Sequence, residues 1–225
     1  MVKTLLRPQP TGWLPAHDHP VQPAAAGGYT DAAGEQLLSA HEVLNRVYPH
    51  SPLHAQRNPV IRRACVAYAN SLHNPDVNSS GPWSPAVSPF TDHSSSILPL
   101  VQHRFWEQLE VLAAPIHLRH RRLPLATSAE LLVRFRTGGD LGIGICQTAP
   151  RDQLSPFHLE AEVGAAVALL ADTWGWFPTR SFLIFCRPEQ TTVELVDVDR
   201  ALSRWIDAVD VYRWTAKNLG WDKQL

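Results

Sequence analysis

Hydrophobic and polar residues alternate most regularly between residues 126 and 148. The apolar members of this pattern are, in chain order, Val133, Phe135, Leu141, Ile143 and Ile145. A tight Thr-Gly-Gly-Asp sequence at residues 137–140 separates the first two from the other three. Alternation with a period of two on both sides of a Gly-Gly turn is typical of a β-hairpin. We therefore predict two antiparallel strands, with Glu130 entering the first strand and Gln147 closing the second.

Other segments repeat their apolar residues every three or four positions, which is the period of an α-helix. A short helix is expected around residues 37–44, because Ser39 is a suitable N-cap and Glu42, three residues later, completes a capping box. Further helices are expected over residues 58–72, 97–113, 157–174 and 199–218, and further strands over residues 181–186 and 191–196. This order predicts an α/β fold with a small mixed central sheet flanked by helices.

Length and composition are those of one folded domain with two segments of different character. The chain has 225 residues, of which 44% are hydrophobic and 18% are charged. Residues 1–34 are rich in Pro, Ala, Gly and His and are expected to form a flexible N-terminal arm. Residues 73–96 are rich in Ser, Pro and Asn and are expected to form a long loop. Residues 35–225 would then make up a single domain.

The cysteines and the absence of long apolar runs bear on the cellular compartment in which the protein is expected. Cys65, Cys146 and Cys186 each lie in an apolar run and form no CxxC pair. This pattern predicts buried free thiols in a reducing environment. No signal-peptide pattern begins the chain, and no apolar run is long enough to span a bilayer. We therefore expect a cytoplasmic protein that does not contact membranes.

Charge becomes informative only at the level of local patches. The formal net charge of -1 gives the whole chain no attraction to nucleic acid. A basic run at residues 117–122 could form a strand that binds phosphates, or a cationic strand edge that prevents aggregation. Arg62 and Arg63 begin the helix expected at residues 58–72, where a cation opposes the helix dipole. That position is unfavourable unless an anion lies nearby.

The hairpin and the helix that follows it resemble a known nuclease family. The stretches ATSAELLV (residues 126–133), GIGICQT (142–148) and EVGAAVALL (162–170) are similar to the core of RecB-like nucleases of the PD-(D/E)XK superfamily. The similarity is strongest to the branch that includes the mitochondrial genome maintenance exonuclease and its phage or cyanobacterial relatives. It extends over roughly residues 37–212 and implies a restriction-endonuclease-like core. In that core Glu130 takes the position of the first metal-binding acid.

The resemblance also implies which chemical groups have been replaced. In the family pattern, Ile145 takes the position of the second metal-binding acid and Gln147 that of the lysine. Glu162 replaces a glutamine of the following helix, and Arg62 replaces a histidine of an earlier helix. Phosphodiester hydrolysis in such a site uses Mg²⁺ or Mn²⁺ held by carboxylates on neighbouring strands. Ile145 offers no oxygen ligand, and Gln147 carries no charge to stabilise the transition state. Glu130 would therefore hold a metal weakly at most, and no cofactor is expected unless the protein is active.

Three functions follow as hypotheses, in this order of preference. The first is a pseudonuclease that binds single-stranded or end-bearing DNA without cutting it, through Arg62, Arg119, Arg121 and Arg122. The second is a non-catalytic scaffold that binds protein partners. The third is an active metal-dependent exonuclease that uses Glu130, with Glu162 as a substitute ligand. Glu130, Gln147 and Glu162 are the degenerate catalytic positions. The hairpin register predicts that Glu130 and Gln147 face one side of the sheet, beside the helix carrying Glu162.

Overall fold

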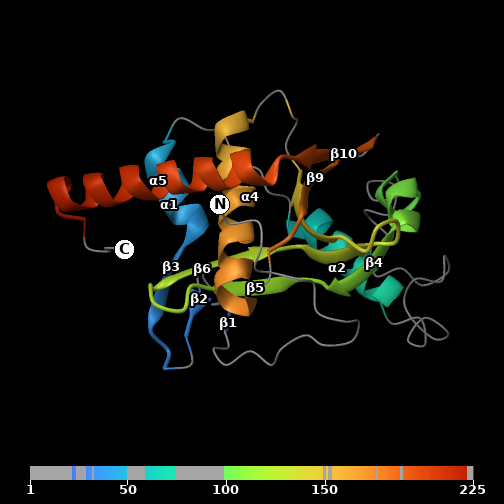
Figure 1. The fold of residues 1–225 in the computed structure, drawn as a ribbon, viewed down its shortest axis with the longest axis horizontal. Helices are drawn as coiled ribbons and strands as arrows, with labels where there is room; N and C mark the ends of the chain where they lie inside the picture. Colours follow the sequence, from blue (N-terminus) through green and yellow to red (C-terminus); the bar gives the residue numbers. More distant parts are fainter. Residues whose placement is uncertain are drawn as a thin grey trace.

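Two mixed β-sheets with packed helices make up the described part of the chain (Figure 1). The computed structural model describes residues 22–23, 29–31, 33–49, 59–73, 99–148, 151, 154–175, 177–187, 190–221 and 225. The first sheet has the order β1 (Gln22–Pro23), β2 (Tyr29–Thr30), β3 (Gln36–Ser39), β6 (Leu125–Ala129) and β5 (Ile116–Arg119). The second has the order β10 (Thr191–Val196), β9 (Arg180–Cys186), β8 (Leu141–Gln147), β7 (Leu131–Phe135) and β4 (Leu109–Ala113). Strands β3 and β6 pair in parallel, as do β8 and β9. The predicted α/β class is therefore confirmed, although the strands form two sheets and not one central sheet.

The predicted hairpin is present as β7 and β8. The two strands pair antiparallel, with Leu132 opposite Ile143. Gly138 and Gly139 have φ angles of 88° and 69°, which a side chain would strain. The strand expected to contain Glu130 is divided at that residue: β6 belongs to the first sheet and β7 to the second. Glu130 therefore lies at the bend where the chain passes from one sheet to the other.

Four predicted helices are present, three of them with nearly the predicted limits, whereas the first begins and ends three residues later than predicted because residues 36–39 form β3. They are α1 (Ala40–Val47), α2 (Pro59–His73), α4 (Pro156–Trp174) and α5 (Val198–Leu219). Ser39 caps α1, because its hydroxyl accepts a hydrogen bond from the backbone N–H of Glu42 at 2.9 Å. Gly164 in α4 allows α5 to approach closely: a Cβ at this position would lie 2.0 Å from the carbonyl oxygen of Ala201. Packing of α5 on α4 thus requires glycine there.

The helix predicted over residues 97–113 is wrong in its second half. Residues 104–108 form a 3-10 helix, η3 (Arg104–Gln108), and the next five residues form β4. Leu109 and Val111 are buried with Glu110 exposed between them, which is the alternation of a half-buried strand. Pairing with β7 provides β4 with backbone hydrogen bonds along the sheet edge. This tertiary pairing outweighed the helical spacing of the apolar residues.

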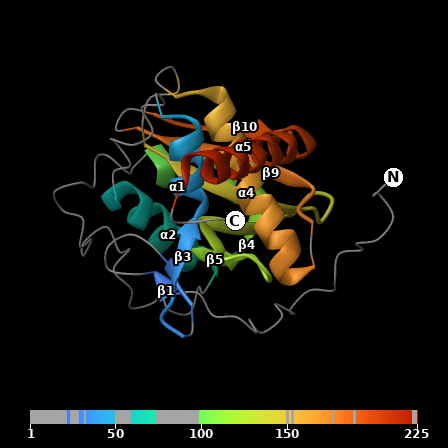
Figure 2. The same ribbon diagram turned by 90° about the vertical axis from the view of Figure 1, so that its left-hand side faces the viewer.

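Helices cover both faces of the second sheet and create two hydrophobic cores. One core contains Ile143 and Ile145 of β8 together with residues of α1, α4 and α5. The other contains Cys146 of β8 with residues of α2 and η3. In Figure 2, α2 and α4 lie on the two sides of the strands. Side chains of β8 therefore point alternately toward α4 and toward α2.

The two segments of unusual composition are only partly described. Most of the expected loop at residues 73–96, and residues 1–21 of the expected arm, lie outside the described residues. Within the rest of the arm, β1 and β2 pair in the first sheet, and the Tyr29 hydroxyl donates to Ser128 Oγ at 2.8 Å. The domain boundary at residue 34 stays a prediction. Among the described helices, none combines the length and the hydrophobicity needed to cross a membrane.

Candidate functional site

Glu130 binds an arginine and a backbone amide through its two carboxylate oxygens. Oε1 accepts hydrogen bonds from Nε of Arg62, at 2.8 Å, and from Nη2 of the same guanidinium. Oε2 accepts the backbone N–H of Cys146 at 2.8 Å. The Glu130 side chain is only 4% exposed. The carboxylate is thus buried with its charge balanced by Arg62.

Arg62 lies in the first turn of α2, where the sequence suggested that a nearby anion would be needed. Glu130 is that anion. Burial by itself lowers the pKa of Arg62, but the charge and hydrogen bond of Glu130 outweigh burial and raise it above its usual value. The Arg62 side chain remains 26% exposed. Its Nη1 has no hydrogen-bond partner among the described residues. One edge of the guanidinium is therefore held by Glu130, and the other can bind a ligand.

Gln147 and Glu162 form a second pair, on the α4 side of β8. Nε2 of Gln147 donates to Oε2 of Glu162 at 2.8 Å. Gln147 is completely buried, and within the described chain its Oε1 accepts no hydrogen bond. The expected position of Gln147 beside the helix that carries Glu162 is confirmed. The carboxylate of Glu130, however, is directed to α2 and not to this pair.

The prediction that Glu130 and Gln147 face one side of the sheet is therefore wrong. It assumed a single straight strand through Glu130, whereas the chain bends there and passes from β6 in one sheet to β7 in the other. The bend directs the carboxylate to Arg62. Glu130 and Gln147, which were predicted to be degenerate catalytic positions, are thus bonded to two different helices.

Ile145, which the sequence resemblance places at the second acid, has no side-chain oxygen to offer a metal ion. It is 1% exposed and packs in the core formed with α4. In the described residues, no group of three or more His, Cys, Asp or Glu is arranged to hold a metal. A divalent ion at Glu130 would have to displace Arg62 from Oε1 or Cys146 N–H from Oε2. The proposed weak metal ligand is thus already occupied by groups of the protein.

The other predicted DNA-binding arginines lie away from Glu130. Arg119 is opposite Ala126 in the β5–β6 pair, four residues before Glu130, which is about 13 Å along a strand. It forms an ion pair with Asp31 at 3.5 Å. Arg121 donates from Nη2 to the Thr173 carbonyl at 3.0 Å. Arg122 is exposed. Arg119, Arg121 and Arg122 therefore form a second basic region at the edge strand β5, and Arg62 alone accompanies Glu130.

A cluster of three cysteines next to Glu130 was missed by sequence reasoning. The Sγ atoms of Cys146 and Cys186 are 3.5 Å apart, and Cys65 of α2 contacts Cys146. All three thiols are buried, as predicted. Hydrogen bonding with Cys146, followed by burial, raises the pKa of both Cys65 and Cys186. Their apolar surroundings in the sequence indicated burial, but nothing in the sequence indicated that they meet.

Comparisons with known proteins give no family. No protein-family model and no curated protein matches the sequence. One solved structure, described as "Crystal structure of SSO0001", aligns over 79% of this chain and 90% of its own, at 12% identity and a TM-score of 0.28. A likeness this distant identifies neither a family nor an activity. The function is therefore argued from the site alone.

Proposed function

We propose that the protein binds nucleic acid without cleaving it and has a restriction-endonuclease-like core of PD-(D/E)XK descent. The descent rests on the sequence resemblance, because the side chains of Glu130 and Gln147 do not share one face. In this proposal Arg62 supplies the positive charge that a divalent metal ion supplies in an active nuclease. The observation that carries it is the contact of Arg62 with Glu130. Glu130 is the position that resembles the first metal-binding acid.

The arrangement favours binding over hydrolysis. A divalent ion accelerates phosphodiester hydrolysis by lowering the pKa of a bound water and by neutralising the phosphoryl oxygens. A guanidinium can neutralise phosphate charge, but it has no open coordination position for water. Ile145 provides no ligand, and Gln147 provides no cation. Because Gln147 is bonded to Glu162 on the other face of β8, it is also not directed toward Glu130.

Arg62 is suited to hold a phosphate. Its partial exposure leaves a donor edge for an anion, while the bond to Glu130 fixes the orientation of the guanidinium. A planar guanidinium can bind two phosphate oxygens at once. The DNA ligand we propose is single-stranded or bears an end, and its binding would need no metal and would weaken steeply with salt.

The basic region at β5 has a secondary part in this proposal. Arg119 and Arg121 already contact Asp31 and the Thr173 carbonyl, which reduces what they can offer to phosphate. The distance of about 13 Å from Glu130 corresponds to roughly four stacked nucleotides, at about 3.4 Å for each. A single DNA strand of about four nucleotides would therefore span a distance of this size, from Glu130 toward Arg119.

The test is fluorescence anisotropy of a labelled single-stranded oligonucleotide in EDTA, from low to physiological salt. The key variant is Arg62→Gln/Glu130→Gln, which removes the guanidinium without leaving a buried charge unpaired. We expect it to weaken binding about tenfold, the effect of losing one charge-assisted contact to phosphate. Glu130→Gln alone should bind equally well or more tightly, because it releases Arg62 from its anion. The matched control is Arg134→Gln/Glu110→Gln, which neutralises another Arg–Glu pair, between β7 and β4.

Three results would contradict the proposal in different ways. If the wild-type protein does not bind at low salt, only the scaffold hypothesis is left. If the oligonucleotide is shortened when Mn²⁺ replaces EDTA, and Glu130→Gln abolishes this, the protein is an active exonuclease. Equal loss of binding in the control variant would show that the loss is not specific to Arg62.

A further inference from the structure

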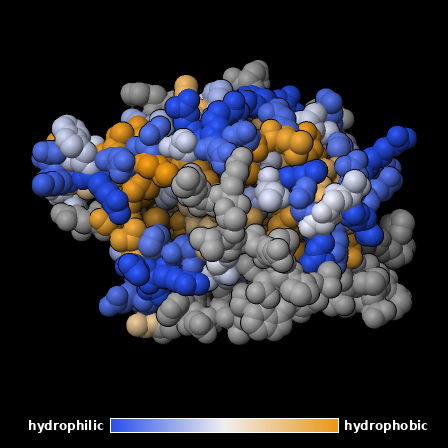
Figure 3. Space-filling view, viewed as in Figure 1, coloured by the Kyte–Doolittle hydropathy of each residue, from blue (hydrophilic) through white to orange (hydrophobic). Residues whose placement is uncertain are grey.

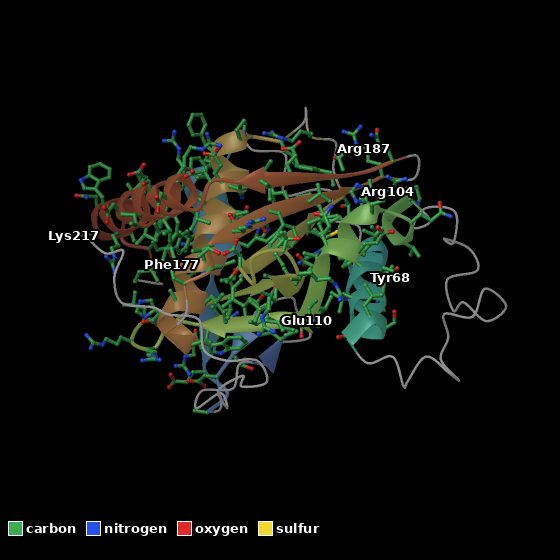
Figure 4. All side chains as sticks on the ribbon, turned by 45° about the vertical axis from the view of Figure 1, so that its right-hand side comes forward. Tyr68, Arg104, Glu110, Phe177, Arg187 and Lys217 are labelled. Carbon is green, nitrogen blue, oxygen red and sulfur yellow. The ribbon has the colours of Figure 1, made fainter. Side chains whose placement is uncertain are left out.

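The outer side of α5 carries exposed apolar residues between charges of both signs. Ile206 is 56% exposed and Trp214 is 68% exposed. Both lie opposite the inner side of the helix, where Ala201, Trp205, Ala208 and Tyr212 are buried against the protein. In Figure 1, the C-terminal half of α5 extends past α1 and α4, and Figure 4 shows Lys217 at this projecting end. The outer side of α5 is therefore accessible along much of its length.

The exposed residues follow one helical stripe. At 3.6 residues per turn, positions three, four and seven apart share a face. The stripe consists of Ser203, Ile206, Asp207, Asp210, Arg213, Trp214 and Lys217, all of which are exposed. Hydrophilic and hydrophobic surface meet along the region of α5 in the space-filling view (Figure 3). Two apolar anchors spaced eight residues apart with charges between them resemble one half of a helix–helix interface.

Charges along this stripe are separated by sign. The acids Asp207 and Asp210 come first, and the bases Arg213 and Lys217 follow one turn later. Among the described residues, Asp210, Arg213 and Lys217 form no ion pair, and Asp207 has only a long contact of 3.9 Å with Arg204. By contrast, Arg200 and Arg204 are bonded to Glu160 of α4. The acids and bases of the stripe thus remain available to a partner.

We propose that this stripe binds the same stripe on a second copy of the chain, with the two α5 helices antiparallel. A twofold axis beside residues 211 and 212 would place Asp210 opposite Arg213 of the second copy, and Asp207 opposite Lys217. Each pair occurs twice. Trp214 would then cover the helix surface between Ile206 and Asp210 of the second copy. A parallel pair would instead bring like charges together, so the sign pattern selects the antiparallel arrangement and a self-complementary partner.

The expected dimer is weak and reversible. A helix of 22 residues is about 33 Å long. One such pair of helices buries less than the roughly 1,200 Å² typical of stable complexes. Association should therefore appear at micromolar to millimolar protein concentration. It does not depend on DNA binding at Arg62, which lies on α2.

The test is sedimentation equilibrium of the full chain over a wide concentration range, with two charge variants. Asp210→Arg places bases opposite bases in its own homodimer, and Arg213→Asp places acids opposite acids. Each variant alone should be monomeric where the wild-type protein dimerises. An equimolar mixture should dimerise again, because the arginine introduced at position 210 of one variant then faces the aspartate introduced at position 213 of the other. The remaining native pair is kept in this heterodimer.

Trp214→Ala should weaken the dimer at least tenfold. The matched control is Leu219→Ala, which removes an equally exposed apolar side chain (67%) of the same helix from the side opposite the stripe. The proposal is overturned if the wild-type protein stays monomeric at hundreds of micromolar. It is also overturned if the mixture of charge variants associates no better than either variant alone. Circular dichroism of each variant confirms that α5 is intact.

Discussion

The two faces of β8 hold the candidate site residues in different surroundings. On the α2 face, the charged Arg62–Glu130 pair lies beside three buried thiols and is partly open to solvent. On the α4 face, Gln147 and Glu162 form an amide–carboxyl hydrogen bond inside an apolar core. Strand β8 thus separates the partly exposed Arg62–Glu130 ion pair from the Gln147–Glu162 pair, which is enclosed by helices.

The comparison indicates which face can still bind a ligand. A buried polar pair contributes to packing and specificity, but it cannot reach a macromolecule unless the helices separate. A partly exposed guanidinium can bind an anion while its carboxylate partner keeps it in place. Function is therefore expected on the α2 face, and the α4 face has become part of the core.

The largest expected difference between the faces is in stability. Arg62→Met leaves the carboxylate of Glu130 buried without its cation, which should cost about 3–5 kcal/mol of unfolding free energy. Glu162→Gln keeps a hydrogen-bonding partner for Gln147 and changes volume little, so it should cost less than about 1.5 kcal/mol. Urea unfolding at neutral pH measures both. An equal loss of unfolding free energy in the two variants would show that the Arg62–Glu130 pair does not contribute more to stability than the Gln147–Glu162 pair.

A double-mutant cycle separates the pair from its surroundings. Adding Glu130→Gln to Arg62→Met should recover part of the lost stability, since the unpaired charge is then removed. If the two losses simply add, the ion pair does not couple the residues in solution.

Sequence patterns predicted most helices and the hairpin because these elements depend on local spacing and caps. Ser39 capped α1 as expected, and the Gly138–Gly139 turn joined β7 to β8. The strand at residues 109–113 was missed because its partner, β7, is a separate segment later in the chain. Its apolar residues fit a helical period as well as a strand period. Only the pairing distinguishes the two.

The candidate site was predicted as a set of residues but not as an arrangement. Alternation along the hairpin suggested one continuous first strand. The bend at Glu130 instead transfers the chain between sheets and directs the carboxylate to Arg62. Sequence spacing cannot reveal such a bend, because no proline or glycine marks it. The contact of Cys65 with Cys146, and of Cys146 with Cys186, likewise depends on how α2, β8 and β9 meet.

A smaller difference between the faces should appear at alkaline pH. The pKa values of Cys65 and Cys186 in the folded protein lie above the ordinary thiol value of 9.0. Below that value both folded and unfolded chains are protonated, and the stability is fully present. As pH rises past it, the unfolded chain loses protons that the folded chain keeps, so stability falls by up to about 1.4 kcal/mol per pH unit for each thiol.

The measurement is urea unfolding with reductant between about pH 8 and pH 9, where most tyrosines of the unfolded chain, with an ordinary pKa of about 10, are still protonated. Cys65→Ala should reduce the decline of the unfolding free energy with pH by up to about 1.4 kcal/mol per pH unit, which is the contribution of one thiol. This reduction is expected whatever the effect of the substitution on stability at neutral pH. The control is Ala161→Ser on the α4 face, which disturbs a buried position without removing a titrating group. An unchanged slope in Cys65→Ala would mean that this thiol is not kept protonated by the fold.

The smallest expected effect is that of divalent metal, and it separates the α2 face from a working nuclease site. Arg62 and the Cys146 N–H occupy the Glu130 carboxylate. A single carboxylate in competition with them should bind Mn²⁺ no more tightly than about 10 mM, so that about 1 mM metal stabilises the fold by only about 0.06 kcal/mol. The melting temperature should then shift by a fraction of a degree. Thermal melts with Mn²⁺ or Mg²⁺ and with EDTA measure this shift. The control is Glu110→Ala, which removes an exposed carboxylate of β4 (Figure 4).

A saturable rise in melting temperature at micromolar Mn²⁺ that disappears in Glu130→Ala but not in the control would mean that metal displaces Arg62. The α2 face would then be a metal-dependent catalytic site. Arg62 would bind Glu130 only while the metal is absent, and it would not replace the metal in function.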